Sequence, residues 1–304
     1  MAHVTFVHGI GNKPAAAELS RAWRGTLADY DLDLDTLGVT SEFVYWADLL
    51  YPKPAAGARL ESVSGIDLAE VPEIGMAWSL RSEADFLRAL SAEIGLTELA
   101  TDAAEIDVPG MDTPDGFEER VWLPWFIKRR LMKILLRDVH HYLFDAEHSP
   151  RPGETYRLRE EIRSRMVAAL SRGAERPGPH VVVAHSLGTV IAYDCLKRLG
   201  DCPEIDGLIT FGSPLGIDEV QDRLRPEWSR ADGYPARVGR WVNVYDRLDV
   251  VCGLDPKLGN DFSRDRAHVV EDLHVPNTGS WRHTATKYLA GSGVRNALEE
   301  MLSR

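Results

Sequence analysis

Cysteine is scarce in this sequence, and its few thiols suggest no disulfide framework. Three cysteines occur among 304 residues, and they are Cys195, Cys202 and Cys252. Their number is odd and no two have CxxC spacing, so neither a set of disulfides nor a cysteine metal site is indicated. Such usage is typical of reduced thiols inside the cell, and we expect a cytoplasmic protein without disulfides.

Long apolar runs are absent as well. No uncharged stretch reaches the length of about 18 apolar residues that a membrane-spanning helix needs. The segment Met1 to His8 has no basic start followed by a long apolar run, so we expect no secretion signal. These absences predict a soluble protein.

Positive charge is in deficit. Lys and Arg number 35 against 47 Asp and Glu, which leaves a net charge of -12. A field of that sign repels phosphate backbones, so nucleic acid is not an expected partner. The remaining composition, 44% hydrophobic and 27% charged, is that of an ordinary globular protein.

Short β-branched runs alternate with longer helical patterns along the chain. The expected strands cover residues 4–7, 42–46, 180–184, 208–211, 241–245 and 268–275, and the expected helices cover 15–30, 154–172, 189–199 and 283–302. In the first helix, apolar residues spaced by three and four form one face: Leu19, Ala22, Trp23, Leu27 and Tyr30. This alternation predicts an α/β fold with a mostly parallel central sheet flanked by helices.

Residues 52–150 interrupt the alternation with scattered Gly and Pro and several helical stretches. We interpret this segment as a helical cap, or lid, inserted into a single domain. The core of that domain is then residues 1–51 and 150–304.

The strongest chemical signal is Ala184-His185-Ser186-Leu187-Gly188, which joins an expected strand directly to an expected helix. A strand, a sharp turn and a helix are the context of a nucleophile elbow. The strained turn tolerates only small residues two positions before and after the nucleophile, and Ala184 and Gly188 are small. Alanine replaces the usual first glycine. An ordinary serine in a small-residue turn is the alternative, and the flanking elements favour Ser186 as a nucleophile.

A serine nucleophile needs a base, and the base needs a carboxylate to orient it. The required chain order is Ser, then Asp or Glu, then His. Asp249 follows the expected strand 241–245, and Asp246 in the same loop competes for the role. His283 lies after the last expected strand and at the start of the last helix, where the base is expected.

His268 and His274 are rivals to His283 as the base. We expect both within the strand 268–275, where they would point into or away from the sheet and not stand at its edge. His283 is therefore the favoured base.

Two backbone N–H groups should face the oxygen that becomes charged during attack. Leu187, directly after the nucleophile, supplies one. The loop His8-Gly9-Ile10-Gly11 ends the first strand, and Ile10 is the expected second donor. His8, Gly9 and His185 are candidate substrate-binding residues around this oxyanion hole, with His8 structural rather than catalytic.

Residues 1–50 and 150–304 together resemble an α/β-hydrolase of the lipase and esterase type. The segment from Thr210 to Leu215 is similar to the one after the elbow helix in many such lipases, including deacylases that act on lipid anchors. An acid that leads into Val250-Val251, as Asp249 does, resembles their acid loop, and this favours Asp249 over Asp246.

The resemblance implies hydrolysis of an acyl ester, from a small molecule or a lipid, through an acyl-enzyme without metal or organic cofactor. A thioesterase or an amidase with the same triad is an alternative. An inactive binding protein with this fold is a further one.

Residues 122–137 of the cap are rich in aromatic and basic side chains, which is typical of a surface-seeking amphipathic helix. Packing on the rim of the sheet is the simpler interpretation. The functional one is an acyl-chain site or a peripheral contact with a membrane, and its candidate residues are Trp122, Trp125 and Phe126.

Overall fold

The computed structural model describes residues 1–55 and 138–303, apart from 146, 152, 250, 253–254, 267 and 279–281. Most of the segment predicted to be a helical cap therefore lies outside the described residues. The candidates Trp122, Trp125 and Phe126 lie outside them too, so their proposed contact with substrate stays a prediction.

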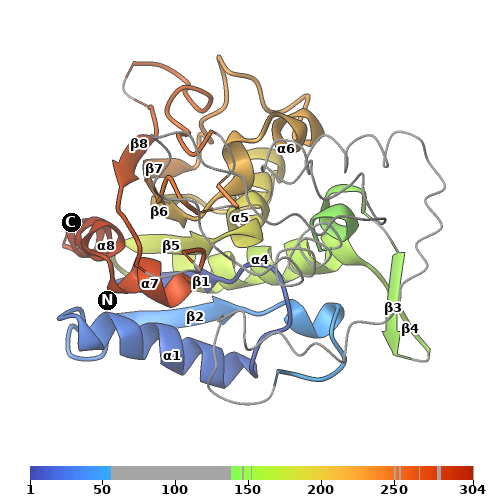
Figure 1. The fold of residues 1–304 in the computed structure, drawn as a ribbon, viewed down its shortest axis with the longest axis horizontal. Helices are drawn as coiled ribbons and strands as arrows, with labels where there is room; N and C mark the ends of the chain where they lie inside the picture. The colour runs from blue at the N-terminus through green and yellow to red at the C-terminus, as the bar shows by residue number, and fades with distance from the viewer. Residues whose placement is uncertain are drawn as a thin grey trace, which may run out of the picture.

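Six strands form one sheet in the order β2-β1-β5-β6-β7-β8 (Figure 1). They are β1 His3–Val7, β2 Thr40–Val44, β5 His180–His185, β6 Ile205–Phe211, β7 Val238–Tyr245 and β8 Glu271–His274. All neighbours in this sheet pair in parallel. The predicted α/β class, with a parallel central sheet flanked by helices, is confirmed.

Helices cover both faces of the sheet. The longer ones are α1 Ala16–Asp29, α4 Leu158–Ala174, α5 Leu187–Arg198 and α8 Ser292–Leu302, and the shorter ones are α6 Asp218–Arg223, α7 Ala285–Ala290 and the 3-10 turns η1 Ala47–Leu49 and η4 Pro214–Gly216.

Two apolar cores lie on opposite sides of the sheet, because successive side chains of a strand point to opposite faces. Val181 and Val183 of β5 pack in the core that holds α1, α7 and α8. Val182 and Ala184 pack in the core that holds α4 and α5. Burial on both faces explains why every residue of β1 and β5 is buried, as parallel sheets require.

Helix α1 has the amphipathic pattern predicted from the sequence. Leu19, Trp23 and Leu27 are buried on one face. Tyr30, expected on that face, is 48% exposed, because α1 ends at Asp29, before the face reaches it.

The structure corrects the start of the helix expected at residue 154. Residues Glu154–Arg157 form β4, which pairs antiparallel with β3, Glu147–Arg151, and α4 begins only at Leu158. The sequence did not predict this hairpin because β3 contains no β-branched or aromatic residue, the types that are enriched in strands.

The C-terminal elements are shorter than expected. The strand predicted for residues 268–275 is confined to β8, Glu271–His274. The single helix predicted for 283–302 is two helices, because Gly291 between α7 and α8 is extended, with φ -70° and ψ 145°.

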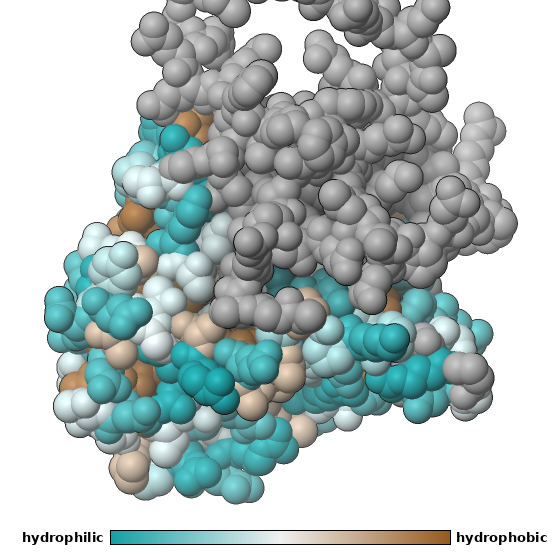
Figure 2. All heavy atoms as spheres, turned by 60° about the horizontal axis from the view of Figure 1, so that its bottom comes forward, coloured by the Kyte–Doolittle hydropathy of each residue, from teal (hydrophilic) through white to brown (hydrophobic). Residues whose placement is uncertain are grey.

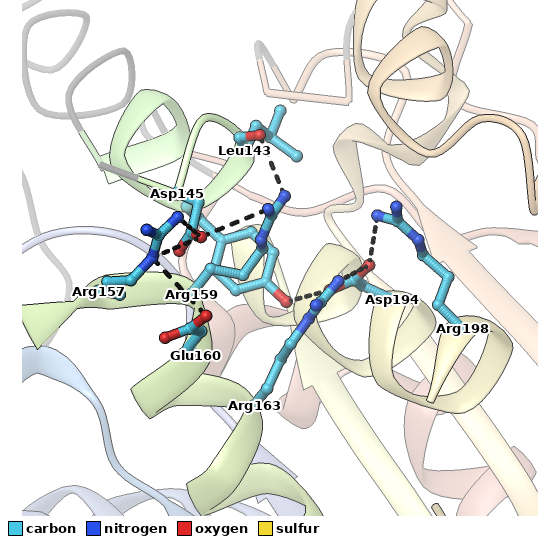
Figure 3. A network of polar contacts seen from close by, with 9 residues as sticks. Leu143, Asp145, Arg157, Arg159, Glu160, Arg163, Asp194 and Arg198 are labelled. Carbon is cyan, nitrogen blue, oxygen red and sulfur yellow. Dashed lines mark hydrogen bonds and ion pairs between the residues drawn. The ribbon is translucent and has the colours of Figure 1, made fainter. Parts of the chain in front are cut away.

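A charged network attaches residues 138–145 to α4 and α5 (Figure 3). Asp194 of α5 accepts hydrogen bonds from Arg163 at 2.7 and 2.8 Å, from Arg198 at 3.0 Å and from the Tyr142 hydroxyl at 2.7 Å. Asp145 pairs with Arg157 at 2.7 Å. These contacts of Tyr142 and Asp145 hold residues 138–145 against the core.

The surface seen in Figure 2 is mostly hydrophilic over the described residues, with apolar residues in small separate patches. The large apolar side chains most exposed in the described part are Met1, Tyr30, Leu37, Val269 and Leu273. None of the helices among the described residues combines the length and apolar character needed to cross a membrane.

Candidate functional site

The site lies where the strand order reverses. The chain leaves β1 for β2 on one side, and then crosses to β5 on the other side and continues to β8. In open parallel sheets, ligands bind beyond the carboxyl ends of the strands at such a point. The loop after β1 and the turn after β5 meet here, since a Cβ atom placed on Gly9 would lie 2.5 Å from the Cβ of Ser186.

Ser186 occupies the sharp turn between β5 and α5 and has the strained backbone that the sequence pattern predicted. Its φ is 55° and its ψ is -130°, a region that residues other than glycine rarely adopt. The N–H of Ser186 donates to the carbonyl of Phe211 at 3.1 Å, which ties the turn to the end of β6. Its Oγ is buried and has no hydrogen-bond partner among the described residues.

Asp249 and His283 form a buried pair. Nδ1 of His283 lies 2.8 and 2.9 Å from the two carboxylate oxygens. Burial raises the pKa of Asp249, but His283, the Tyr288 hydroxyl and the Val251 N–H outweigh this effect and hold the pKa below its usual value. The ionised carboxylate fixes the tautomer with hydrogen on Nδ1, so Nε2 is the nitrogen that can accept a proton.

Gly212, at the end of β6, lies against this pair. Its φ is +56°, and a Cβ there would lie 3.1 Å from both Oδ2 of Asp249 and Nδ1 of His283. The ring of His283 is centred 4.6 Å from the ring of His185, the residue before Ser186. Of the three residues predicted from separate segments, Asp249 and His283 are in contact, and His283 lies beside His185, which directly precedes Ser186.

Asp246 has a different position. Its carboxylate accepts hydrogen bonds from the N–H groups of Leu248 at 2.9 Å and Asn277 at 2.7 Å, and it contacts Arg282 at 3.3 Å. Asn277 in turn donates to the carbonyl of Arg282 at 2.8 Å. Of the two acids that the sequence left in competition, Asp249 contacts His283 and Asp246 holds the loop before it.

The two expected oxyanion donors lie beside Ser186. Leu187 is the first residue of α5, where N–H groups have no acceptor within the helix. Ile10 follows Gly9, which packs on Ser186. The next N–H along this loop, that of Gly11, donates to the buried carboxylate of Asp138 at 2.7 Å, so Asp138 fixes the loop. The oxyanion role of Leu187 and Ile10 stays a prediction.

His8 is engaged within the protein. Nδ1 of His8 donates to the carbonyl of Gly9 at 2.8 Å, and Nε2 accepts from the N–H of Trp46 at 3.0 Å. The rings of His8 and Trp46 stack with their centres 4.7 Å apart. Burial, aided by the charge of Lys13, lowers the pKa of His8 to about 3, so the ring is neutral. Burial and the neighbouring His283 also hold the pKa of His185 well below its usual value.

Contact of His8, Gly9 and His185 with substrate remains a prediction. The hydrogen bonds of His8 agree with the structural role expected for it.

The rival histidines lie elsewhere. His268 precedes β8, so the expectation that it lies in a strand is wrong, and its Nδ1 contacts the carboxylate of Asp265 at 2.9 Å. His274 is an exposed residue of β8, beside the ring of Tyr245.

The described residues also contain no cluster of three or more His, Cys, Asp or Glu that could hold a metal ion.

Sequence reasoning missed Tyr288 and Asp138, which both contact the site. Tyr288 donates to Asp249 and Asp138 fixes Gly11. No motif marks either residue. Their proximity to the site depends on how α7 and residues 138–143 pack.

Comparisons with known proteins assign no family. No family model and no curated protein matches the chain. The chain is similar to the crystal structure of an uncharacterized protein from Pseudomonas aeruginosa, with a TM-score of 0.32 and 10% sequence identity. The similarity covers 99% of this chain and 46% of that one, so this chain spans about half the length of that protein.

Proposed function

We propose that this protein is a serine hydrolase of the α/β-hydrolase fold that cleaves acyl esters. One observation carries the proposal. Ser186 is held in a strained turn directly after His185, whose ring lies 4.6 Å from the ring of His283, and Nδ1 of this buried His283 contacts both oxygens of Asp249 at 2.8 and 2.9 Å. Serine is a weak nucleophile, and a histidine oriented by a carboxylate is the group that activates it.

The topology supports the same reading. Ser186 follows β5, Asp249 follows β7 and His283 follows β8. This is the chain order Ser, Asp, His of α/β-hydrolases, with the nucleophile at the end of a parallel strand. The position at the strand-order reversal is also where such sheets bind ligands.

The proposed reaction proceeds through an acyl-enzyme. Oγ of Ser186 attacks the ester carbonyl carbon while Nε2 of His283 takes its proton, and Asp249 stabilises the imidazolium. The N–H groups of Leu187 and Ile10 bind the oxyanion, each worth about 10²–10³ in rate. Collapse expels the alcohol, which receives the proton from His283. Water then repeats the sequence, and the carboxylic acid leaves with Ser186 restored.

Specificity is proposed to reside in the segment 52–150, with Trp122, Trp125 and Phe126 against the acyl chain. Thioesters and amides would use the same machinery, since the fold hosts many chemistries. A small-molecule or lipid ester, a cytoplasmic location and peripheral membrane contact through this segment remain part of the proposal.

The test is hydrolysis of p-nitrophenyl esters from acetate to palmitate by wild type, Ser186→Ala and a control, Ser171→Ala. Ser171 is exposed on α4, on the far side of the helix from the core. We expect Ser186→Ala to lose at least about 10⁴-fold in kcat and Ser171→Ala to match wild type. The preferred chain length reports the size of the acyl site.

Equal rates for wild type and folded Ser186→Ala would sink the ester-hydrolase proposal. Thioesters and amides are then assayed in the same way. A folded wild type that also fails to react with a fluorophosphonate probe would instead support a binding protein that lacks activity.

A further inference from the structure

The hydroxyl of Tyr288 connects the acid of the site to the loop that carries it. Tyr288 is fully buried on α7, shortly after His283 in the chain. Its O–H donates to Oδ2 of Asp249 at 2.7 Å, and its oxygen accepts the N–H of Asp246 at 3.2 Å. A tyrosine hydroxyl has one hydrogen to donate, and here the carboxylate receives it.

With this bond, each oxygen of Asp249 has a donor besides His283. Oδ1 accepts the N–H of Val251 at 2.9 Å and Oδ2 accepts the O–H of Tyr288. The two donors hold the carboxylate at both ends while Nδ1 of His283 contacts it between them. The orientation of the carboxylate is therefore set by Tyr288 on one side and by the loop backbone on the other.

The pKa values of Tyr288, Cys252 and His185 are shifted away from neutral pH. Burial and the adjacent Asp249 raise the pKa of the Tyr288 hydroxyl well above its usual value. Burial and Asp249 likewise raise the pKa of the Cys252 thiol, whose sulfur lies 3.8 Å from the hydroxyl. The rings of Phe211 and His185 are centred 5.5 and 6.3 Å from the ring of Tyr288, and burial holds the pKa of His185 well below its usual value. Near neutral pH, the protonated hydroxyl of Tyr288 therefore donates to the ionised carboxylate of Asp249.

We propose that Tyr288 is a positioning residue of this site, whose hydroxyl fixes the carboxylate of Asp249 against His283 and disperses part of its negative charge. The catalytic consequence rests on the proposed hydrolase function, but the effect on His283 does not. Without the hydroxyl, the carboxylate attracts the protonated imidazole more strongly, and its orientation is fixed by the Val251 N–H on one side only. His283 should then keep its proton to a higher pH, and fewer molecules should hold the productive orientation.

The first test needs no substrate. The titration of His283 is followed by NMR in wild type, Tyr288→Phe and Tyr193→Phe, with the resonance assigned by its loss in His283→Gln. Tyr193 is the matched control, because its hydroxyl is also buried but donates to the carbonyl of Gly233 in the opposite core. We expect the midpoint to move to higher pH in Tyr288→Phe and to stay unchanged in Tyr193→Phe.

A second variant has the opposite expected sign. Site-specific replacement of Tyr288 with 3-fluorotyrosine keeps the ring and makes the hydroxyl a stronger donor, so the midpoint should move to lower pH. This measurement tests the proposal even where Tyr288→Phe does not fold. An unchanged midpoint in a folded variant of either kind overturns it.

Kinetics supply the third measurement. For esters that wild type hydrolyses, Tyr288→Phe should lower kcat about tenfold with KM unchanged, the scale of one hydrogen bond to a charged group. The acidic limb of the kcat/KM profile should move to higher pH, which a merely structural role would not cause. Absence of Ser186-dependent hydrolysis in wild type would reject the proposed function alone. If wild type hydrolyses esters but Tyr288→Phe has the same kcat and the same acidic limb of the kcat/KM profile, the role of Tyr288 alone is rejected.

Discussion

At Gly212 the absence of a side chain allows the acid and the base to lie against the end of β6. The residue combines two demands, a φ of +56° and a position 3.1 Å from atoms of both Asp249 and His283 for any Cβ. Gly38 shares only the first demand, with a φ of +66° and no atom within 4 Å of a Cβ. The two glycines therefore separate backbone strain from displacement of the site.

We expect Gly212→Ala and Gly38→Ala to lower the free energy of unfolding by similar amounts, about 1–2 kcal/mol, because alanine is strained at positive φ. Only Gly212→Ala should lower kcat, by about 10²-fold, since a small displacement of reacting groups has that effect. Urea unfolding and ester hydrolysis measure the two quantities. Equal kcat values in the two variants would contradict this account of Gly212.

At the scale of elements, Asp194 joins three parts of the chain. Arg163 comes from α4 and Arg198 from α5 itself (Figure 3). Tyr142 comes from the segment before β3. Burial raises the pKa of Asp194, but Arg163 and Tyr142 outweigh it and hold the pKa below its ordinary value. The carboxylate is thus charged, buried and paired.

Asp194→Asn should lower the free energy of unfolding by about 3–5 kcal/mol, because breaking a buried pair leaves uncompensated charge. The matched control is Asp222→Asn, whose carboxylate pairs with Arg225 at 3.2 Å with both side chains about two-thirds exposed, and it should change stability by less than about 1 kcal/mol.

The effect of Asp194 should depend on pH. A pKa depressed in the folded state contributes stability above the ordinary value of 3.8 and loses it as pH falls through the folded pKa. Urea unfolding should therefore show the full difference in free energy of unfolding between wild type and Asp194→Asn at pH 7, and a smaller difference below about pH 4. A gap that is constant with pH would mean that the charge of Asp194 is not what stabilises the fold.

For the whole molecule, buried histidines should set the onset of acid unfolding. Burial, which is the largest influence on each, lowers the pKa of His8 to about 3 and of His180 to about 4, and holds that of His185 well below its usual value. The unfolded chain takes up these protons below about pH 6.5 while the folded protein does not. Stability is therefore complete above that pH and is lost as pH falls toward the folded values.

Each such histidine should remove about 1.4 kcal/mol of stability per pH unit between about pH 6 and pH 4, so the three together give about 4 kcal/mol per unit. Urea unfolding across this range measures the slope. His180→Gln should make the slope shallower by the share of one histidine, and His274→Gln, at an exposed position of β8, should leave it unchanged. A flat profile in wild type would contradict the prediction.

The sequence by itself determined the α/β class, the turn of Ser186 and the order of Ser186, Asp249 and His283. These features depend on local patterns: alternation of strand and helix, small residues around a sharp turn, and polar residues directly after strands. Each of these patterns depends on interactions between residues that are close in sequence.

Only the tertiary structure decided which side chains meet. Asp246 and Asp249 lie in one loop, and the packing of α7 determines that Asp249 contacts His283 while Asp246 binds Asn277. The hairpin of β3 and β4 escaped prediction because its pairing, not its composition, stabilises it. Tyr288 and Asp138 belong to no sequence motif. Tyr288 contacts Asp249 and Asp138 contacts Gly11, and both contacts join segments that are remote in sequence. Such contacts form only when the whole chain folds.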